Sequence, residues 1–523
     1  MMRKHWDVTG WVTARRAPLL AAGIIGLAAA LRLGLLRAGW PGTDSDDSTM
    51  GLMALHILSA GEHPLFFYGQ AYMGTIEAYL GAAGFAIMGV SVFALKSGLV
   101  VLYAAFLAAL YLLLARVFSR GWALAGLLLL SFGADEMLYH QLNAYGGYLE
   151  TLFFGTVLLV LTAAMVADGG KTSSPSQRSM EAERDPSSAR STLDAVEGRQ
   201  SRVRSTSLPA AGGQAIRPQP VASLEHARGV SPTYSPRRQF QRRAKYAIAS
   251  KGHGIRLGAA FAGWGLAAGL GLWSDPLVAP FVVLTGAALG VTRWRELRGW
   301  LGALALAGLL LGLAPWGVYA VMSPSFDAAK SFLQRAPSTT SQALAPRTAA
   351  PAPSLAETVR DRALGTLLIA VPNATGATAV CPLTVSDSWP QDRWKTPAIR
   401  ACIAVRGVWG SAFVLLLGLA LALELQVAVA LLRIRPARWS HKERLAASRT
   451  LVRVCALGAP ALTIALFAAS SAAERSPWIF SRYLITALIV LPVMLATLWE
   501  HAPRLSPLTP WRRRLPRLSL AIL

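Results

Sequence analysis

The 523-residue sequence is poor in charged residues and in cysteine, and it lacks the short motifs of common nucleotide and hydrolase sites. Only 15% of its residues are charged and only three are cysteines, which excludes a disulfide-rich scaffold. No GxxxxGK[ST] phosphate loop, no zinc-type spacing of Cys and His and no GxSxG elbow occurs. The sequence therefore gives no support to cytoplasmic nucleotide chemistry. No cleavable signal peptide is evident either, because the basic segment 1–16 leads into an apolar run without a small-residue cleavage site.

What the chain has in abundance is apolar sequence, at 54% of all residues. Apolar runs of nearly 20 residues recur from end to end, which is typical of an all-α integral membrane protein with many crossings. We predict ten crossings, at about 18–36, 97–115, 121–134, 147–167, 257–273, 276–292, 299–321, 407–432, 450–471 and 482–499.

The net charge of +24 could suggest a nucleic-acid partner, but the distribution of the basic residues argues against one. They gather in the terminal segments and in alternate loops, so the positive-inside rule places both chain ends in the cytoplasm. An even number of crossings then requires the moderately apolar stretch 77–95 to be an interfacial helix on the outer face. We expect a multi-pass protein of the plasma (inner) membrane with its functional face on the extracytoplasmic side.

These assignments divide the chain into seven segments. They are a cytoplasmic N-terminus (1–17), an N-terminal membrane module (18–167) whose first external loop is 37–96, a disordered basic cytoplasmic loop (168–256), membrane spans (257–321), an external loop (322–406), further spans (407–499) and a basic cytoplasmic tail (500–523). Within the second external loop, Cys381 and Cys402 form either a disulfide or two free thiols, whereas Cys455 is predicted to be apolar packing inside a span.

Acidic residues cluster directly after the first predicted span. Asp44, Asp46 and Asp47 place three carboxylates within four residues, either as a solvated helix cap or as a functional site at the membrane boundary. Two further polar groups fall on the same predicted face, one around Glu150 and one at Arg482-Tyr483. A carboxylate can take a hydroxyl proton and an arginine can stabilise a departing phosphate, although Arg-Tyr pairs also serve as interfacial anchors. The other members of these groups are His56, Glu62, His63, Asp135, Glu136, His140, Tyr145, Glu474 and Arg475.

Two runs in the first external loop carry a resemblance to a known family. The runs 46–54 (DDSTMGLMA) and 64–74 (PLFFYGQAYMG) resemble the first external loop of GT-C membrane glycosyltransferases, in the branch that includes protein O-mannosyltransferases and the lipid A aminoarabinose transferase. The resemblance covers about 37–167 and is only architectural beyond it. It implies a GT-C-type bundle of about 10 transmembrane helices, with external juxtamembrane helices in the first loop. It also implies transfer, usually with inversion, of a sugar from a polyprenyl-phosphate donor to an extracytoplasmic lipid, glycan or protein acceptor, as in cell envelope glycosylation.

The same resemblance suggests roles for individual residues. Asp46 matches the family's catalytic Asp, Asp47 stands where Glu is usual, and Asp44 remains an alternative base because it forms Asp-X-Asp with Asp46. The substrate-binding residues that we predict are Glu150, Tyr68, Gln70, Tyr72, Arg482 and Tyr483. Some relatives use a divalent cation, and the acidic cluster would suit Mg or Mn, but nothing in the sequence requires one and we assign no metal ligands.

A different class of function is also compatible with this sequence, namely a non-enzymatic transporter or flippase for a lipid-linked sugar or another anionic solute. Such proteins usually show internal repeats and functional groups near the bilayer midplane. Here the candidate residues gather at one predicted face and no repeat is evident, which favours the enzyme.

Overall fold

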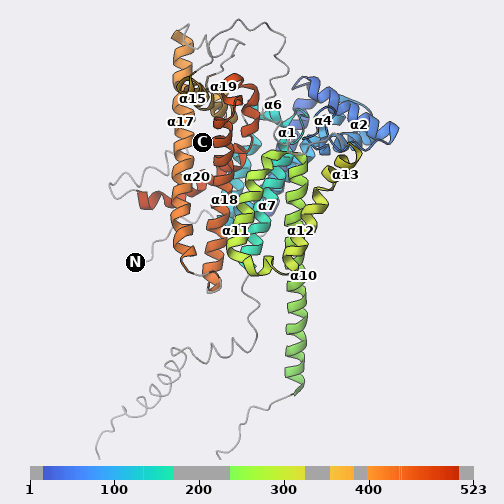
Figure 1. The fold of residues 1–523 in the computed structure, drawn as a ribbon, viewed down its shortest axis with the longest axis vertical. Helices are drawn as coiled ribbons and strands as arrows, with labels where there is room; N and C mark the ends of the chain where they lie inside the picture. The colour runs from blue at the N-terminus through green and yellow to red at the C-terminus, as the bar shows by residue number, and fades with distance from the viewer. Residues whose placement is uncertain are drawn as a thin grey trace, which may run out of the picture. The chain divides into compact units, whose positions relative to one another are not determined.

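The computed structural model describes residues 16–133, 135–168, 236–323, 354–381, 397–434, 436 and 439–505. In this part of the chain the secondary structure is helical, and no strand occurs beyond one isolated bridge between Phe67 and Gln70. The chain is therefore an all-α protein, as predicted (Figure 1). Most of the loop predicted to be disordered (169–235), the Pro/Ala-rich part of the second external loop and the C-terminal tail after 505 lie outside the described residues.

The first half of the chain contains long apolar helices that alternate with shorter ones. The elements are α1 (Arg16–Arg37), α2 (Ser45–Ala60), α3 (Ile76–Met88), α4 (Val92–Val117), α5 (Arg120–Ser131), α6 (Asp135–Gln141) and α7 (Tyr148–Asp168). The second half contains α10 (Pro236–Ser274), η2 (Pro276–Val278), α11 (Ala279–Leu297), α12 (Trp300–Gly312), α13 (Ala314–Met322), α15 (Leu355–Leu364), the π-helical turn η4 (Gly365–Ala370), α16 (Val371–Ala374), η5 (Ala377–Ala379), α17 (Pro397–Leu432), α18 (His441–Ala469), α19 (Ala472–Arg475), η7 (Ile479–Leu484) and α20 (Ala487–Leu505).

Seven of the described helical segments are long and apolar enough to cross a membrane, and the bent pair α12–α13 makes an eighth if it counts as one span. They correspond to eight of the ten predicted crossings. The other two predicted crossings fall on the shorter apolar helices α5 and α20. The helix α3 has 13 residues, or about 20 Å, which is too short to cross a hydrocarbon core of about 30 Å.

The chain segments around α5 and α20 nevertheless run between the two ends of the bundle. Arg482, just before α20, approaches Asp46 at one end, whereas Glu500 near the end of α20 forms an ion pair with Arg453 at the other (2.8 Å). Likewise α5 begins near the C-terminal end of α4, and the chain has returned to the N-terminal end of α4 at Asn143, which contacts Lys96. Whether α5 and α20 count as crossings stays a prediction, since seven helices, or eight with the bent pair, are long and apolar enough in the described part of the chain.

Buried arginines explain how helices can end inside an apolar bundle. The last carbonyl groups of a helix have no partner within that helix, and leaving them unpaired away from water is costly. Arg32 on α1 donates to the carbonyls of Leu130 and Ser131, where α5 ends, and its guanidinium lies over the ring of Tyr103. Three other buried arginines donate to carbonyls at or near helix ends in the same way: Arg453 to Val117, Arg293 to Met165 and Arg406 to Leu368 and Ile369.

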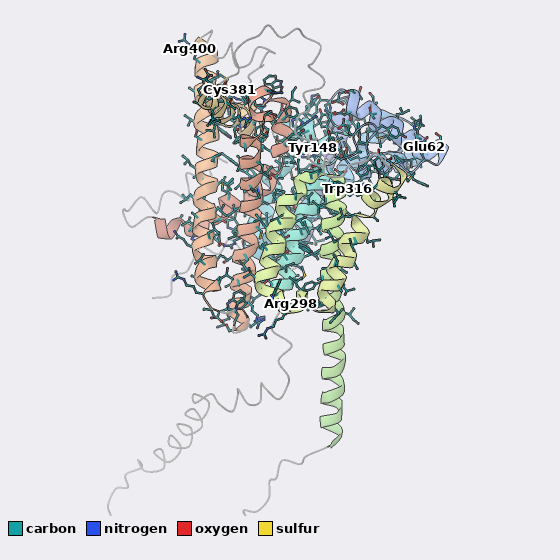
Figure 2. The ribbon with its side chains drawn as sticks, viewed as in Figure 1. Glu62, Tyr148, Arg298, Trp316, Cys381 and Arg400 are labelled. Atoms are coloured by element: carbon teal, nitrogen blue, oxygen red, sulfur yellow. A yellow bond between two sulfur atoms is a disulfide. The ribbon has the colours of Figure 1, made fainter. Side chains whose placement is uncertain are left out.

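The two ends of the bundle can be told apart by labelled residues. Figure 2 places Arg298 at one end, and Cys381 and Tyr148 toward the other. Cys381 and Cys402 are joined in a disulfide, which settles the alternative that the sequence left open, and Cys455 is a buried free cysteine inside α18. Asn373, which begins a glycosylation sequon, is buried and accepts a hydrogen bond from Arg406.

Two helices begin before the spans predicted for them. The disordered loop was expected to extend to 256, but α10 already begins at Pro236. The segment after Pro236 contains Gln, Arg, Lys and Ala and no glycine before Gly252, so its helix propensity is high. The helix α17 begins at Pro397 and not near 407, because the external loop 322–406 ends in a helical extension of the span.

Candidate functional site

The N-terminus of α2 organises the acidic cluster. Asp44 is the N-cap residue, and its carboxylate accepts hydrogen bonds from the backbone N–H groups of Asp46 and Asp47, both at 3.0 Å. The carboxylate of Asp47 in turn accepts the backbone N–H of Asp44, which completes a capping box. Asp44 is therefore a helix cap, which is one of the two alternatives for the cluster, and its Oδ1 accepts hydrogen bonds from the first turn of α2.

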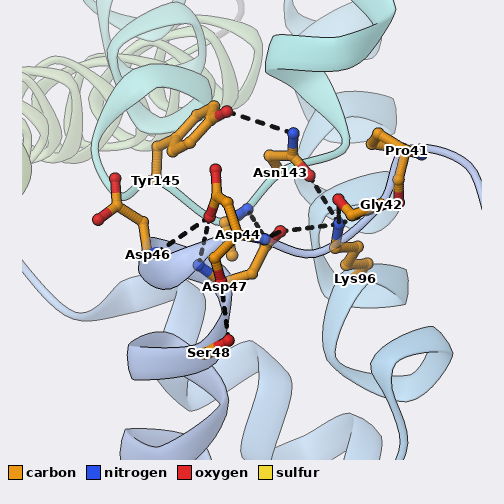
Figure 3. Close-up of polar contacts among 10 residues, drawn as sticks. Pro41, Gly42, Asp44, Asp46, Asp47, Ser48, Lys96, Asn143 and Tyr145 are labelled. Atoms are coloured by element: carbon orange, nitrogen blue, oxygen red, sulfur yellow. Dashed lines mark hydrogen bonds and ion pairs between the residues drawn. The ribbon is translucent and has the colours of Figure 1, made fainter.

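Asp47 is used in a buried ion pair (Figure 3). Its Oδ2 lies 2.9 Å from Nζ of Lys96 on α4, and neither side chain is exposed. The other oxygen accepts the backbone N–H of Ala144 at 2.6 Å. Lys96 also donates to the side chain of Asn143 (2.6 Å) and to the carbonyl of Gly42 (3.2 Å). Every strong partner of this pair is thus a protein group, and the pair ties α2, α4 and the segment before α7 together.

Asp46 differs from its two neighbours. Its side chain is 29% exposed, and Oδ2 lies 3.9 Å from a guanidinium nitrogen of Arg482 in η7. Burial raises the pKa of Asp46, and the carboxylates of Asp44 and Asp47 add to the increase, whereas Arg482 opposes it. A carboxylate with this balance is more basic than an exposed Asp but has a cation beside it.

Aromatic rings hold Arg482 in place. Its guanidinium carbon lies 4.9 Å from the ring centre of Tyr145 and 5.7 Å from that of Tyr148, distances at which cation–π attraction contributes. Tyr483 stacks against Tyr148 with ring centres 6.4 Å apart. The Nε atom of Arg482 is buried and has no hydrogen-bond partner within the described residues. The guanidinium therefore retains a donor that a phosphate oxygen would satisfy.

The segment between α6 and α7 contributes side chains to this site. It contributes Asn143 and Tyr145, which contact one another through the amide nitrogen and the phenol oxygen at 3.3 Å. Glu77 on α3 accepts the backbone N–H of Gly146 at 3.0 Å, and Glu150 on α7 interacts with Glu77. Glu77 and Glu150 are both buried, at 3% and 0% exposed. In this structure the predicted substrate-binding residue Glu150 therefore faces the protein interior.

Three predicted substrate-binding residues lie in the loop after α2. The hydroxyl of Tyr68 donates to Glu62 at 2.7 Å and contacts Nδ1 of His56 at 3.0 Å. The hydroxyl of Tyr72 donates to the side chain of Gln70 at 2.6 Å. His56 is ten residues beyond Asp46 on α2, or about 15 Å along the helix. Tyr68 therefore belongs to the far end of α2, away from Asp46 and Arg482.

Two of the remaining predicted groups form ion pairs within the protein. Glu136 and His140 are 3.1 Å apart on α6, and Glu474 pairs with Arg362 at 3.4 Å. His63 is exposed, and Asp135 begins α6.

Lys96, Asn143 and Glu77 are parts of the site that were not predicted. Lys96 carried a usable signal, because it is the one charged residue between 78 and 115, and a charge within apolar sequence marks a structural or functional partner. The other two residues had no such signal. The amide of Asn143 and the acid of Glu77 act through contacts with residues 47 to 69 positions away in the chain.

The residues present do not fit a divalent cation. Asp47 is engaged by Lys96 and by the backbone N–H of Ala144. Oδ1 of Asp44 accepts two backbone N–H groups, whereas Asp46 lies beside Arg482. No group of three or more His, Cys, Asp and Glu side chains that could hold a metal ion occurs among the described residues.

Comparison with known proteins gives one match. No family model matches the chain, and no curated protein does. Among solved structures, the archaeal oligosaccharyltransferase AglB from Archaeoglobus fulgidus, in complex with an inhibitory peptide and a dolichol-phosphate, is similar at 12% identity and a TM-score of 0.38. The alignment covers 96% of this chain and 54% of that one, so the chain spans about half the length of that protein. A likeness at this level assigns no family and no function.

Proposed function

We propose that the chain is a membrane glycosyltransferase that moves a sugar from a polyprenyl-phosphate donor to a hydroxyl-bearing acceptor on the extracytoplasmic side. The observation that carries the proposal is the pairing of Asp46 with Arg482. It brings a partly exposed carboxylate of raised pKa beside a cation that has an unpartnered donor, at the end of a membrane bundle. The Asp46 carboxylate can accept a proton from a hydroxyl group, and the Arg482 guanidinium can bind a phosphate.

The reaction follows from these two groups. The acceptor hydroxyl oxygen attacks the anomeric carbon of the donor sugar, and its proton passes to the Asp46 carboxylate. The bond between the anomeric carbon and the phosphate oxygen breaks, and its electron pair leaves with polyprenyl phosphate. Arg482 stabilises the charge that develops on that phosphate, which is the electrostatic contribution that usually dominates such steps. Attack opposite the leaving phosphate inverts the anomeric centre.

The other acidic residues are assigned supporting roles in this proposal. Asp44 starts α2 and thereby fixes the position of Asp46 two residues later. Asp47 and Lys96 hold α2 against α4 and against the segment that carries Tyr145. Tyr148 and Tyr483 orient the Arg482 guanidinium. The sugar and the acceptor are set by groups beyond this pair.

The proposal is tested by incubating the purified protein in detergent with a panel of polyprenyl phosphates that carry a radiolabelled sugar. Membrane extracts supply the acceptors. We expect one donor to lose its label to an acceptor with equimolar release of polyprenyl phosphate. Movement of the intact donor across proteoliposome membranes, without cleavage of the sugar–phosphate bond, would instead identify a flippase and would overturn the proposal.

A further inference from the structure

The segment 142–147 joins α6 to α7 and presents side chains to the proposed site. Tyr145 lies against Arg482, and Asn143 lies against Lys96. The segment is not helical, and Gly146 and Gly147 adopt φ values of 77° and 82°, which favour glycine. Its backbone N–H groups consequently need partners other than those of a helix.

Two carboxylates from the first external segment provide these partners. Asp47 on α2 accepts the N–H of Ala144 at 2.6 Å, and Glu77 on α3 accepts the N–H of Gly146 at 3.0 Å. Both carboxylates are buried, at 1% and 3% exposed. They hold the backbone on the two sides of Tyr145, so the position of that ring depends on both.

The buried position of Glu77 is energetically unfavourable for a carboxylate. Burial raises its pKa well above the ordinary value, and the neighbouring Glu150 adds to the increase. Asp47 has Lys96 as a counter-ion, whereas no ion pair to a Lys, Arg or His side chain within 4.0 Å is formed by Glu77 among the described residues. An apolar residue would pack in this position at lower cost, except that Gly146 would then lose its acceptor.

The segment 142–147 also packs closely against Asp275, at the end of α10. A side chain at Gly147 would place its first carbon 2.4 Å from the Oδ2 atom of Asp275. The Nε1 group of Trp273, two residues earlier, donates to the carbonyl of Leu65 at 2.8 Å, and Gly74 donates its N–H to the carbonyl of Ser274 at 2.9 Å. The end of α10 therefore packs against the first external segment, next to the glycines of 142–147.

We propose that Glu77 is a positioning residue for the phosphate-binding arginine. Its carboxyl oxygen fixes Gly146, Gly146 sets the position of the Tyr145 ring, and that ring holds the Arg482 guanidinium beside Asp46. The role depends on an acceptor oxygen at this distance from the backbone and not on negative charge. The inference rests on the proposed role of Arg482 in binding the donor phosphate.

Two substitutions separate the acceptor from the charge. Glu77→Gln keeps an acceptor oxygen at the same reach and removes the charge, whereas Glu77→Asp keeps the charge and shortens the side chain by one carbon. The measured quantity is the Kd of each purified variant for tritiated polyprenyl phosphate in detergent, together with kcat and KM for any donor that is active. Tyr79→Ala is the matched control, because Tyr79 lies on the same helix with a side chain that is 37% exposed. Arg482→Ala tests the premise.

We expect Glu77→Gln to bind within about twofold of the parent protein, and Glu77→Asp to bind about tenfold more weakly, the size of one lost hydrogen bond. Tyr79→Ala should bind like the parent. Normal binding by a folded Glu77→Asp variant, or weak binding by a folded Glu77→Gln variant, would overturn the inference. If Glu77→Asp fails to fold, the Gln variant still tests the inference, because a loss of binding by a folded Glu77→Gln protein would overturn it.

A different result would show that Arg482 does not bind the donor phosphate. If Arg482→Ala binds polyprenyl phosphate as tightly as the parent protein, then the phosphate site has been placed wrongly, and the proposed function loses its support whatever Glu77 does. If Arg482→Ala loses binding while both Glu77 variants keep it, the proposed function stands and only the role of Glu77 is rejected.

Discussion

Replacement of Lys96 by methionine should destabilise the protein strongly, because it leaves a buried carboxylate without its cation. The Nζ of Lys96 lies 2.9 Å from Asp47 Oδ2, and both side chains are fully buried. Removing one partner of such a pair typically costs about 3–5 kcal/mol, because the remaining charge keeps its desolvation penalty. Two circumstances shift the cost within that range. The N–H of Ala144 still supports Asp47, which lowers it, whereas Asn143 loses its partner as well, which raises it.

The double variant Asp47→Asn with Lys96→Met provides the decisive comparison. It removes both charges, so we expect it to be more stable than Lys96→Met alone, with a coupling free energy of about 1–3 kcal/mol. Lys442→Met is the matched control, since Lys442 is exposed on α18 and its loss should change the free energy of unfolding by less than about 0.5 kcal/mol. The assay is equilibrium unfolding in mixed micelles, followed by circular dichroism. Additive effects of the two single substitutions, or a Lys96→Met protein as stable as Lys442→Met, would refute this account of the pair.

Three further changes have defined outcomes. Asp44→Asn keeps an N-cap but removes a negative charge that raises the pKa of Asp46, so the acidic limb of kcat/KM should move to lower pH; an unmoved limb would argue against Asp46 as the titrating base. Cys402→Ser opens a loop closed by residues 21 apart and should lower the free energy of unfolding by about 3 kcal/mol, which thermal unfolding with and without reductant would measure; reductant should leave the variant unaffected. Gly147→Ala places a methyl group against Asp275 at a φ of 82° and should cost about 1–3 kcal/mol, whereas Gly34→Ala in an open part of α1 should be neutral or stabilising.

The membrane architecture could be predicted from the sequence because each apolar run carries its own evidence. Length, hydropathy and loop charge are local properties, and they identified the seven long helices, the bent pair and the short helix α3. The same properties did not indicate that helices begin at Pro236 and Pro397, before the predicted spans. Hydropathy reports where a chain can cross a membrane, and it does not report where a helix begins.

The candidate site could be predicted only in part. The acidic cluster after the first span and the resemblance to GT-C glycosyltransferases drew attention to Asp46 and Arg482, and the structure places these two side chains 3.9 Å apart. The sequence alone could not predict that Asp44, Asp46 and Asp47 make different contacts, because all three are acidic residues within four positions. It depends on Lys96 and Ala144, which approach Asp47 from distant parts of the chain. Glu150 is likewise buried next to Glu77, to which no local pattern connects it.

The most direct test of the central claim is the rate of sugar transfer by Asp46→Asn, compared with Asp44→Asn in the same assay. Asn keeps the size of the side chain and removes its ability to take a proton, and general-base catalysis typically contributes about 10²–10⁴-fold. We expect release of polyprenyl phosphate by Asp46→Asn to fall by at least 100-fold, with the variant still folded and still binding the donor. Turnover close to that of the parent protein would contradict the assignment of Asp46 as the base, and with it the chemistry proposed for this site.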